Sequence, residues 1–142
     1  MIEVTESALM DDIAVTRAAF DSLRSRGVRL GIDDFGTGYS SLARLLRLPV
    51  DVIKLDRAFV TDIDARAEAR GMAAAVLQLS AAIGAETLAE GVETEAEAAT
   101  LLNLGYTRGQ GFLFAAAGSV DDLTARLRAR SAYVRLSRRR RG

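Results

Sequence analysis

The chain has 142 residues, of which 49% are hydrophobic and 27% are charged, and it contains neither cysteine nor histidine. This length suits one domain with a small hydrophobic core. The missing residue types exclude disulfides, thiolate or imidazole metal sites, cysteine nucleophiles and Ser-His-Asp catalysis. Any metal ion must therefore be held by oxygen ligands, and any proton transfer must use carboxylate, lysine or water.

The formal net charge is zero, but the charges are unevenly distributed along the chain. Residues 1–125 hold 11 basic and 19 acidic side chains, whereas the remaining residues hold eight arginines and no acid. We expect the Arg-rich tail, residues 131–142, to be disordered and solvated. A contact with nucleic acid or anionic lipid is the alternative, although the tail contains no recognisable motif for a specific nucleic-acid partner.

Neither a membrane span nor a signal peptide is predicted. No apolar run approaches the ~20 residues that cross a bilayer, and the N-terminus lacks a basic start followed by an apolar stretch. We therefore expect a cytoplasmic protein.

Short β-branched runs alternate with helical stretches along the chain. The predicted strands cover residues 2–5, 28–33, 52–55, 86–89 and 111–114. Apolar residues spaced by three and four predict the helices. These helices cover 9–27, a segment through Leu42, Leu45 and Leu46 that Pro49 closes, 72–84, 94–102 with a Thr94/Glu97 capping box, and 120–127. The alternation predicts an α/β domain with right-handed βαβ crossovers and a parallel sheet covered by helices.

Functional side chains gather where these strands end, the edge at which parallel α/β proteins carry their sites. Side-chain alternation places Glu3, Asp33 and Lys54 on the face opposite the helices, which is the interior of the barrel if the sheet curls. Glu90 shares the parity of Leu88, so we expect the fourth strand to end before it.

Adjacent carboxylates at Asp33 and Asp34, followed by a Gly-Thr-Gly turn, concentrate negative charge that a divalent cation would neutralise. With Glu3 and Glu90, four carboxylates converge at this edge, a set that suits Mg²⁺ or Mn²⁺. Lys54 is the single lysine of the chain and is aimed at the same place.

Two chemistries remain open for this cluster. One is phosphodiester hydrolysis with two ions about 4 Å apart and Lys54 stabilising the developing charge. The other is magnesium-dependent enolisation with Lys54 as the base. Strand-end acids also cap helices or pair with arginine, and we favour that structural interpretation for Glu6 and Glu93.

Five segments within residues 1–128 stand out by their order and spacing: EVTES at 3–7, DDFGTGYSSL at 33–42, KLD at 54–56, AEGVE at 89–93 and QGFLF at 110–114. They resemble the successive motifs of the EAL domain family, bacterial phosphodiesterases that linearise cyclic di-GMP to pGpG. The resemblance implies a partial (β/α)8 TIM-like barrel of about five βα units. Residues 1–130 would form the C-terminal part of an EAL domain.

The resemblance also implies a role for each matching residue and a two-ion Mg²⁺ or Mn²⁺ site. Glu3 and Asp33 resemble ligands of the first metal, Asp33 and Asp34 ligands of the second, and Lys54 the lysine that contacts the nucleophilic water; Glu90 resembles the general base or metal-water anchor, Gln110 the glutamine near the scissile phosphate, and Glu6 the anchor of the loop at 33–42. In the family this loop couples dimerisation to metal binding, so a homodimer is expected.

The 142 residues depart from the family pattern in one respect. They contain no Glu-Ala-Leu motif, which supplies a metal-binding glutamate and a nearby arginine for substrate, and no matching asparagine ligand. We therefore expect the isolated chain to be inactive and its partner to be the amino-terminal half of the barrel or an upstream sensory domain. The alternative is a non-catalytic module that dimerises or binds cyclic di-GMP without turnover.

Overall fold

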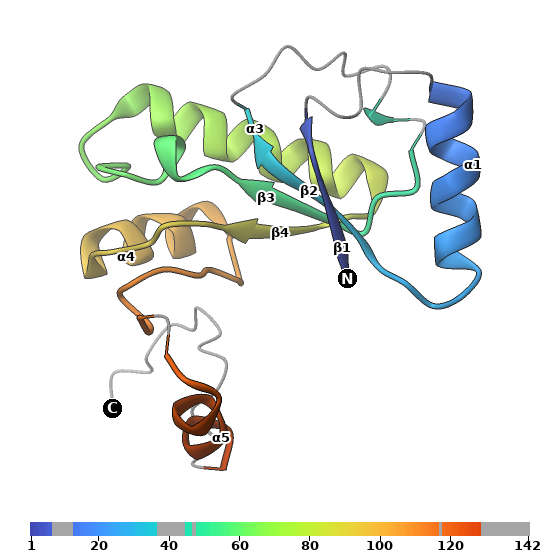
Figure 1. The fold of residues 1–142 in the computed structure, drawn as a ribbon. Coiled ribbons are helices and arrows are strands. Elements are labelled where there is room, and N and C mark those ends of the chain that lie inside the picture. The colour runs from blue at the N-terminus through green and yellow to red at the C-terminus, as the bar shows by residue number, and fades with distance from the viewer. Residues whose placement is uncertain (7–12, 37–44, 47, 117, 129–142) are drawn as a thin grey trace.

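The computed structural model describes residues 1–6, 13–36, 45–46, 48–116 and 118–128 (Figure 1). Its elements, in chain order, are β1 (Ile2–Thr5), α1 (Ile13–Arg24), β2 (Leu30–Phe35), β3 (Val52–Leu55), the 3-10 helix η2 (Arg57–Phe59), α3 (Ala67–Ile83), β4 (Glu86–Ala89), α4 (Glu95–Leu104) and α5 (Val120–Arg128). Four predictions lie outside the described residues: the helix start at Leu9, the part of the next predicted helix around Leu42, the domain boundary at residue 130 and the Arg-rich tail.

The described strands form one parallel sheet in the order β1-β2-β3-β4. This confirms the predicted α/β class with parallel strands joined by helices. Three strands have the predicted bounds, whereas β2 begins and ends two residues later than predicted. Its end moves because Phe35 pairs with Leu55, so β2 continues alongside β3 through the two aspartates.

The predicted fifth strand at 111–114 is wrong. The chain meets the sheet two residues earlier, in an isolated parallel bridge between Ala89 and Gly109, and Gln110 N–H donates to the Ala89 carbonyl at 2.8 Å. Gly111 has φ 155°, and a Cβ there would overlap the backbone of Val92. The close approach to Val92 ends the pairing, and the apolar run becomes a turn in which Phe114 N–H donates to the Gly111 carbonyl.

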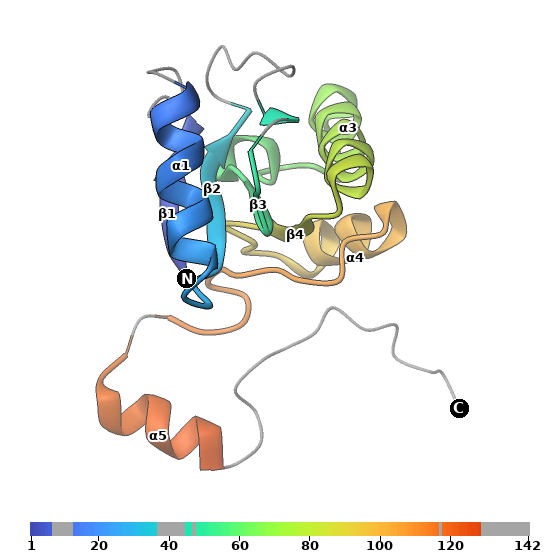
Figure 2. The same ribbon diagram turned by 90° about the vertical axis from the view of Figure 1, so that its right-hand side faces the viewer.

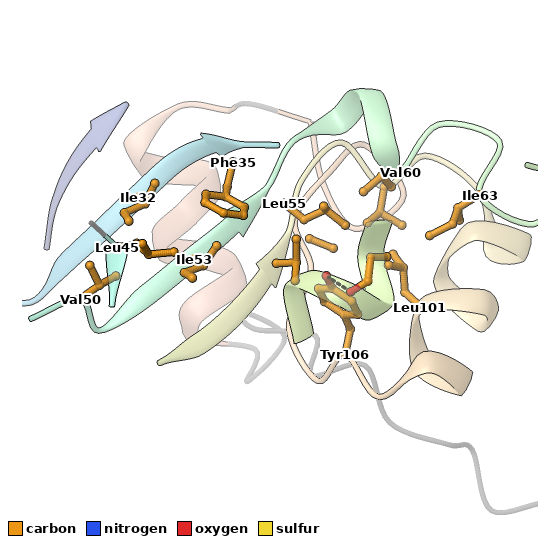
Figure 3. Close-up of a cluster of buried hydrophobic side chains, with 14 of the residues drawn as sticks. Ile32, Phe35, Leu45, Val50, Ile53, Leu55, Val60, Ile63, Leu101 and Tyr106 are labelled. Atoms are coloured by element: carbon orange, nitrogen blue, oxygen red, sulfur yellow. Dashed lines mark hydrogen bonds between the residues drawn. The ribbon is translucent and has the colours of Figure 1, made fainter. Parts of the chain in front are cut away.

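The hydrophobic core lies between the sheet and the helices that follow it (Figure 3). α3 packs along β3 and β4, and α4 packs against α3 (Figures 1 and 2). Ile53 and Leu55 are fully buried on the sheet side. Tyr106, after α4, is also fully buried and donates its hydroxyl to the Ala73 carbonyl of α3 at 3.0 Å. The sheet, α3 and the end of α4 therefore form one packed unit.

Both predicted helix signals flanking β4 are confirmed. α3 ends at Gly84, whose left-handed φ of 73° allows the chain to reverse into β4. α4 begins with a capping box, in which the Thr94 hydroxyl accepts from Glu97 N–H while the Glu97 carboxylate accepts from Thr94 N–H. These signals fix where the loop after β4 begins and ends.

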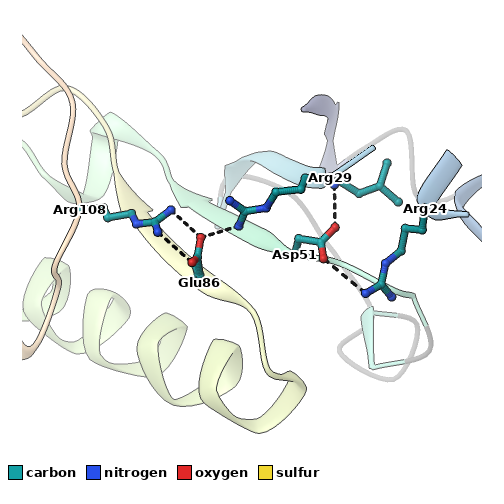
Figure 4. Close-up of polar contacts among 6 residues, drawn as sticks. Arg24, Arg29, Asp51, Glu86 and Arg108 are labelled. Carbon is teal, nitrogen blue, oxygen red and sulfur yellow. Dashed lines mark hydrogen bonds and ion pairs between the residues drawn. The ribbon is translucent and has the colours of Figure 1, made fainter. Parts of the chain in front are cut away.

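A network of ion pairs and hydrogen bonds connects the amino ends of β2, β3 and β4 (Figure 4). Glu86, at the start of β4, pairs with Arg29 before β2 and with Arg108 beside the sheet. Asp51, before β3, accepts from Leu30 N–H at 2.9 Å and lies 3.4 Å from an Arg24 guanidinium nitrogen. The side chains of this network thus link the amino end of β2 with those of β3 and β4.

α5 lies away from the sheet in both ribbon views (Figures 1 and 2). Val120, its first residue, is 78% exposed. Among the described residues, none of the helices has the length and apolar character needed to cross a membrane.

Candidate functional site

Lys54 lies at the centre of a cluster formed by residues from three other segments of the sheet edge. Its Nζ is 2.9 Å from Glu3 Oε2 on β1, 2.7 Å from Asp33 Oδ1 on β2 and 2.7 Å from Glu90 Oε1 after β4. The lysine side chain is only 6% exposed. The structure therefore brings together four predicted site residues that are distant in the sequence.

A backbone irregularity brings Asp34 to the same site as Asp33. In a regular strand, consecutive side chains point to opposite faces. Here the β2–β3 register shifts between Ile32 and Phe35, and Asp34 adopts a left-handed φ of 54°. Carboxylate oxygens of Asp33, Asp34 and Glu90 consequently lie within 4.8 Å of one another.

Crowding of these acids is visible in the pKa of Asp34. Burial raises this pKa, and the negative charge of Asp33 and a hydrogen bond with Asp56 raise it further. Bringing carboxylates this close is unfavourable unless a cation or a proton compensates. An all-oxygen set of this kind has the chemistry of a divalent-cation site, so these residues fit Mg²⁺ or Mn²⁺.

Burial and the neighbouring carboxylates shift the pKa of Lys54 in opposite directions. Burial lowers its pKa, but hydrogen bonds with Asp33, Glu90 and Glu3 outweigh burial and raise the pKa above the ordinary lysine value. Lys54 is therefore a fixed positive charge among the acids.

Glu90 is the most enclosed of the three carboxylates that contact Lys54, with its side chain 15% exposed. Burial raises its pKa, and the hydrogen bond to Lys54 offsets only part of this effect. Gln110, predicted to lie near the substrate, donates its side-chain amide to Glu90 Oε1. β4 ends at Ala89, as we expected because Glu90 would otherwise point to the same side as Leu88. Glu90 therefore lies after the strand, and the alternation of side chains along β4 does not determine its direction.

Glu6 does not join the cluster. It is 3% exposed, and its Oε2 accepts from Gly36 N–H at 2.9 Å, directly after β2. The contact lies at the beginning of the loop at 33–42, where an anchor would act. The loop beyond Gly36 and its predicted dimer contact lie outside the described residues.

Glu93 pairs with an arginine, as the structural interpretation of this acid expects, but sequence reasoning missed the partners that tie the loop after β4 to the segment after β3. Arg57, which the sequence does not single out, pairs with Glu93 Oε1 at 2.8 Å. Glu97, predicted only as half of a capping box, also accepts from Glu93 N–H at 2.8 Å and from Asp62 N–H at 3.1 Å. Local spacing carries no signal for either cross-link, since the partners belong to different βα units.

Comparison with known proteins places this geometry in a family. The EAL domain family profile matches residues 1–117. The cyclic di-GMP phosphodiesterase NbdA of Pseudomonas aeruginosa is 46% identical over 113 residues, which are 80% of this chain and 14% of NbdA. The cyclic di-GMP phosphodiesterase PdeR of Escherichia coli is 40% identical over 114 residues, 80% of this chain and 17% of PdeR.

Solved structures agree with the sequence comparison. The EAL domain of Mycobacterium smegmatis DcpA superposes with a TM-score of 0.86 at 42% identity, covering 93% of this chain and 58% of that one. The PaMucR phosphodiesterase in complex with c-di-GMP gives a TM-score of 0.80 at 39% identity, covering 85% of this chain and 49% of that one.

The chain thus spans about half of these solved structures and a smaller part of the curated relatives. Its four-stranded parallel sheet corresponds to part of their TIM-barrel fold. From the profile match, the identities and the shared fold, the chain belongs to the EAL domain family.

Proposed function

We propose that this chain carries the second half of a cyclic di-GMP phosphodiesterase site, which hydrolyses the cyclic dinucleotide to pGpG with two Mg²⁺ or Mn²⁺ ions. The observation that carries the proposal is the contact of Lys54 Nζ with three carboxylates from separate βα units. The related phosphodiesterases and the c-di-GMP complex of PaMucR support this substrate over the enolisation chemistry that spacing alone left open. The manganese/cy-diGMP complex of Klebsiella pneumoniae BlrP1, 39% identical to this chain over 81% of it, supports the ion type.

In this proposal, Glu3, Asp33 and Asp34 hold the ions, because their oxygens face the cluster. When bound, divalent ions would activate the attacking water and stabilise charge on the phosphoryl oxygens. Lys54 orients that water and adds positive charge against the developing negative charge. Glu90, with its raised pKa, accepts the proton of the water or anchors it.

Gln110 and Glu6 act beside this centre. Gln110 hydrogen bonds to Glu90 and presents its amide at the place where the scissile phosphate would lie. Glu6 holds the backbone directly after β2 and so anchors the loop that follows Asp33 and Asp34. We assign residues 1–130 to the EAL domain and leave 131–142 as a separate tail.

The proposal is tested by supplying the Glu-Ala-Leu segment, which these 142 residues do not contain. The chain is mixed or co-expressed with the amino-terminal half of the NbdA EAL domain, and conversion of cyclic di-GMP to pGpG is followed by chromatography with Mg²⁺ or Mn²⁺. We expect turnover that Asp33→Asn abolishes. Asp21→Asn, which removes an exposed carboxylate of α1, is the matched control and should leave turnover unchanged.

The same experiment separates the second candidate, a module that binds cyclic di-GMP without cleaving it. The missing Glu-Ala-Leu motif favours this candidate for the chain by itself. Calorimetry with cyclic di-GMP and sedimentation of the chain measure binding and dimerisation. Binding without turnover in the folded complex would support the module. If that complex shows no binding and no turnover, both functions are refuted.

A further inference from the structure

We propose that Arg57 is a positioning residue for Glu90. Its side chain reaches from the segment after β3 to the loop after β4, and there it holds the backbone that directs the Glu90 carboxylate toward Lys54. The consequence for metal binding rests on the proposed function, whereas the effect on the loop does not.

Arg57 makes two contacts with this loop. Its guanidinium lies 2.8 Å from Glu93 Oε1. Its aliphatic stem covers Gly91, because a Cβ built on Gly91 would lie 2.8 Å from the Arg57 Cβ and Cδ atoms. Only a glycine can accept the stem at this distance. Arg57 thus holds the loop at the residue directly after Glu90 and again two residues later.

The conformation at Gly91 gives this contact its effect. Gly91 has φ 68°, in the left-handed region, and glycine crosses between backbone conformations more readily than any other residue. The Glu90 carboxylate is placed by the backbone on either side of it. On the amino side, Glu90 N–H donates to the Leu55 carbonyl at 3.1 Å. On the carboxyl side, we infer that the stem of Arg57 restrains the rotation that would swing Glu90 away.

The loop after β4 is held from two sides, by backbone hydrogen bonds to residues 110–113 and by Arg57. Val92 N–H donates to the Gln110 carbonyl at 3.0 Å, and the Val92 carbonyl accepts from Leu113 N–H at 3.0 Å. Arg57 contacts the same loop from the β3 side. Gln110 also contacts Glu90 through its side chain, so both sets of contacts help to position the Glu90 carboxylate.

The contact is suited to positioning because it contributes little to stability. The Arg57 side chain is 59% exposed and that of Glu93 is 38% exposed. Such exposed pairs contribute at most about 1 kcal/mol to folding. Arg57→Ala should therefore leave the protein folded, so its effect on the site can be measured separately.

The charge of Arg57 and its positioning role predict opposite changes in the Mn²⁺ affinity of Arg57→Ala. Removing a cation beside an acidic cluster makes the local potential more negative and strengthens binding of Mn²⁺. Loss of positioning weakens Mn²⁺ binding, because the Glu90 carboxylate leaves its place within 4.8 Å of the Asp33 and Asp34 oxygens, where it would anchor a water on the ion. Residues that orient metal ligands typically change affinity by about 10–100-fold, and for this exposed contact we expect the lower end.

The experiment compares Arg57→Ala, Arg57→Lys and the control Arg17→Ala in the whole chain. Arg17 is a matched arginine, 60% exposed on α1. Mn²⁺ affinity is measured by electron paramagnetic resonance, and hydrogen exchange of the Glu90 and Val92 amides is measured without metal. For Arg57→Ala we expect about 10-fold weaker Mn²⁺ binding and faster exchange at both amides, with partial recovery in Arg57→Lys and no change in Arg17→Ala.

Unchanged or tighter Mn²⁺ binding by Arg57→Ala would overturn the proposal, with or without faster exchange. Unchanged exchange at Glu90 and Val92 would overturn it as well. If the unmodified chain alone binds no Mn²⁺, the same three variants are compared in the complex with the amino-terminal half of the NbdA EAL domain. Absence of Mn²⁺ binding in that complex would refute the proposed two-ion function, and hydrogen exchange would then decide the role of Arg57.

Discussion

Glu97 is the residue whose replacement tests the architecture around the site most directly. It is 4% exposed, and its carboxylate accepts three backbone N–H groups. Glu93 N–H and Thr94 N–H donate to Oε2 at 2.8 and 2.9 Å, and Asp62 N–H donates to Oε1 at 3.1 Å. One side chain thus satisfies donors from the loop after β4 and from the segment after η2.

The cost of removing this carboxylate follows from the donors left behind. A buried donor without a partner costs about 1–3 kcal/mol. Because water can enter the space left by the side chain, we expect Glu97→Ala to lose about 3–4 kcal/mol, less than the full sum. Glu97→Gln keeps one acceptor oxygen but turns an amide toward the remaining donors, so about 2 kcal/mol is expected.

The stability that the Glu97 carboxylate contributes should decrease as the pH falls. Burial raises the pKa of Glu97, but the backbone N–H groups of Glu93, Thr94 and Asp62 outweigh burial, so the pKa is lowered. A carboxyl with a lowered pKa in the folded state stabilises the protein above the unfolded value of about 4.3, and this contribution disappears as pH falls through the folded pKa. The difference between wild type and Glu97→Gln should therefore be full at pH 7 and shrink below about pH 4.

Urea unfolding followed by circular dichroism measures both quantities. The control is Glu95→Gln, an exposed acid in the first turn of the same helix, which should cost less than about 0.5 kcal/mol. Equal losses for Glu97→Gln and Glu95→Gln at pH 7 would refute the reasoning. So would a Glu97→Gln loss that persists undiminished under acid conditions in which the wild type is still folded.

Three other predictions concern the fold. Gly111→Ala should lose about 2–4 kcal/mol in urea unfolding because its methyl group overlaps backbone, whereas Gly71→Ala, which meets no atom within 4 Å in α3, should gain about 0.5–1 kcal/mol; equal effects would contradict the close approach. Tyr106→Phe should cost about 1 kcal/mol by thermal unfolding, since it removes one buried hydrogen bond. Glu86→Gln should cost at most about 1 kcal/mol, and this loss should shrink in 1 M NaCl because the paired groups are exposed; a salt-independent loss would show that the pairing is not electrostatic.

Much of the fold could be predicted from periodicity. Strands β1, β3 and β4, the end of α3 at Gly84 and the capping box of α4 follow from local patterns, and each is found where it was predicted. The fifth strand failed because an apolar, aromatic run also suits a turn packed on the core. What decides between them is the approach of Gly111 to Val92, a contact between segments that local spacing does not encode.

The candidate site shows the same division. Parity correctly directed Glu3, Asp33 and Lys54 to one face, because alternation is a local property of strands. Asp34 has the wrong parity and reaches the cluster only through the register shift and its left-handed backbone. Its membership came from the family resemblance and from charge density, and the bulge that makes it possible is visible only in the structure.

The ionic network around Asp51 and Glu86 has a consequence for engineering. It fastens strand register at the amino edge, on the side of the sheet opposite the carboxylates. Exchanges confined to the loops at the carboxyl edge leave these pairs in place, so we expect such chimaeras to keep the register of β2, β3 and β4. Because these pairs are retained, differences between such chimaeras can be assigned to the exchanged loops.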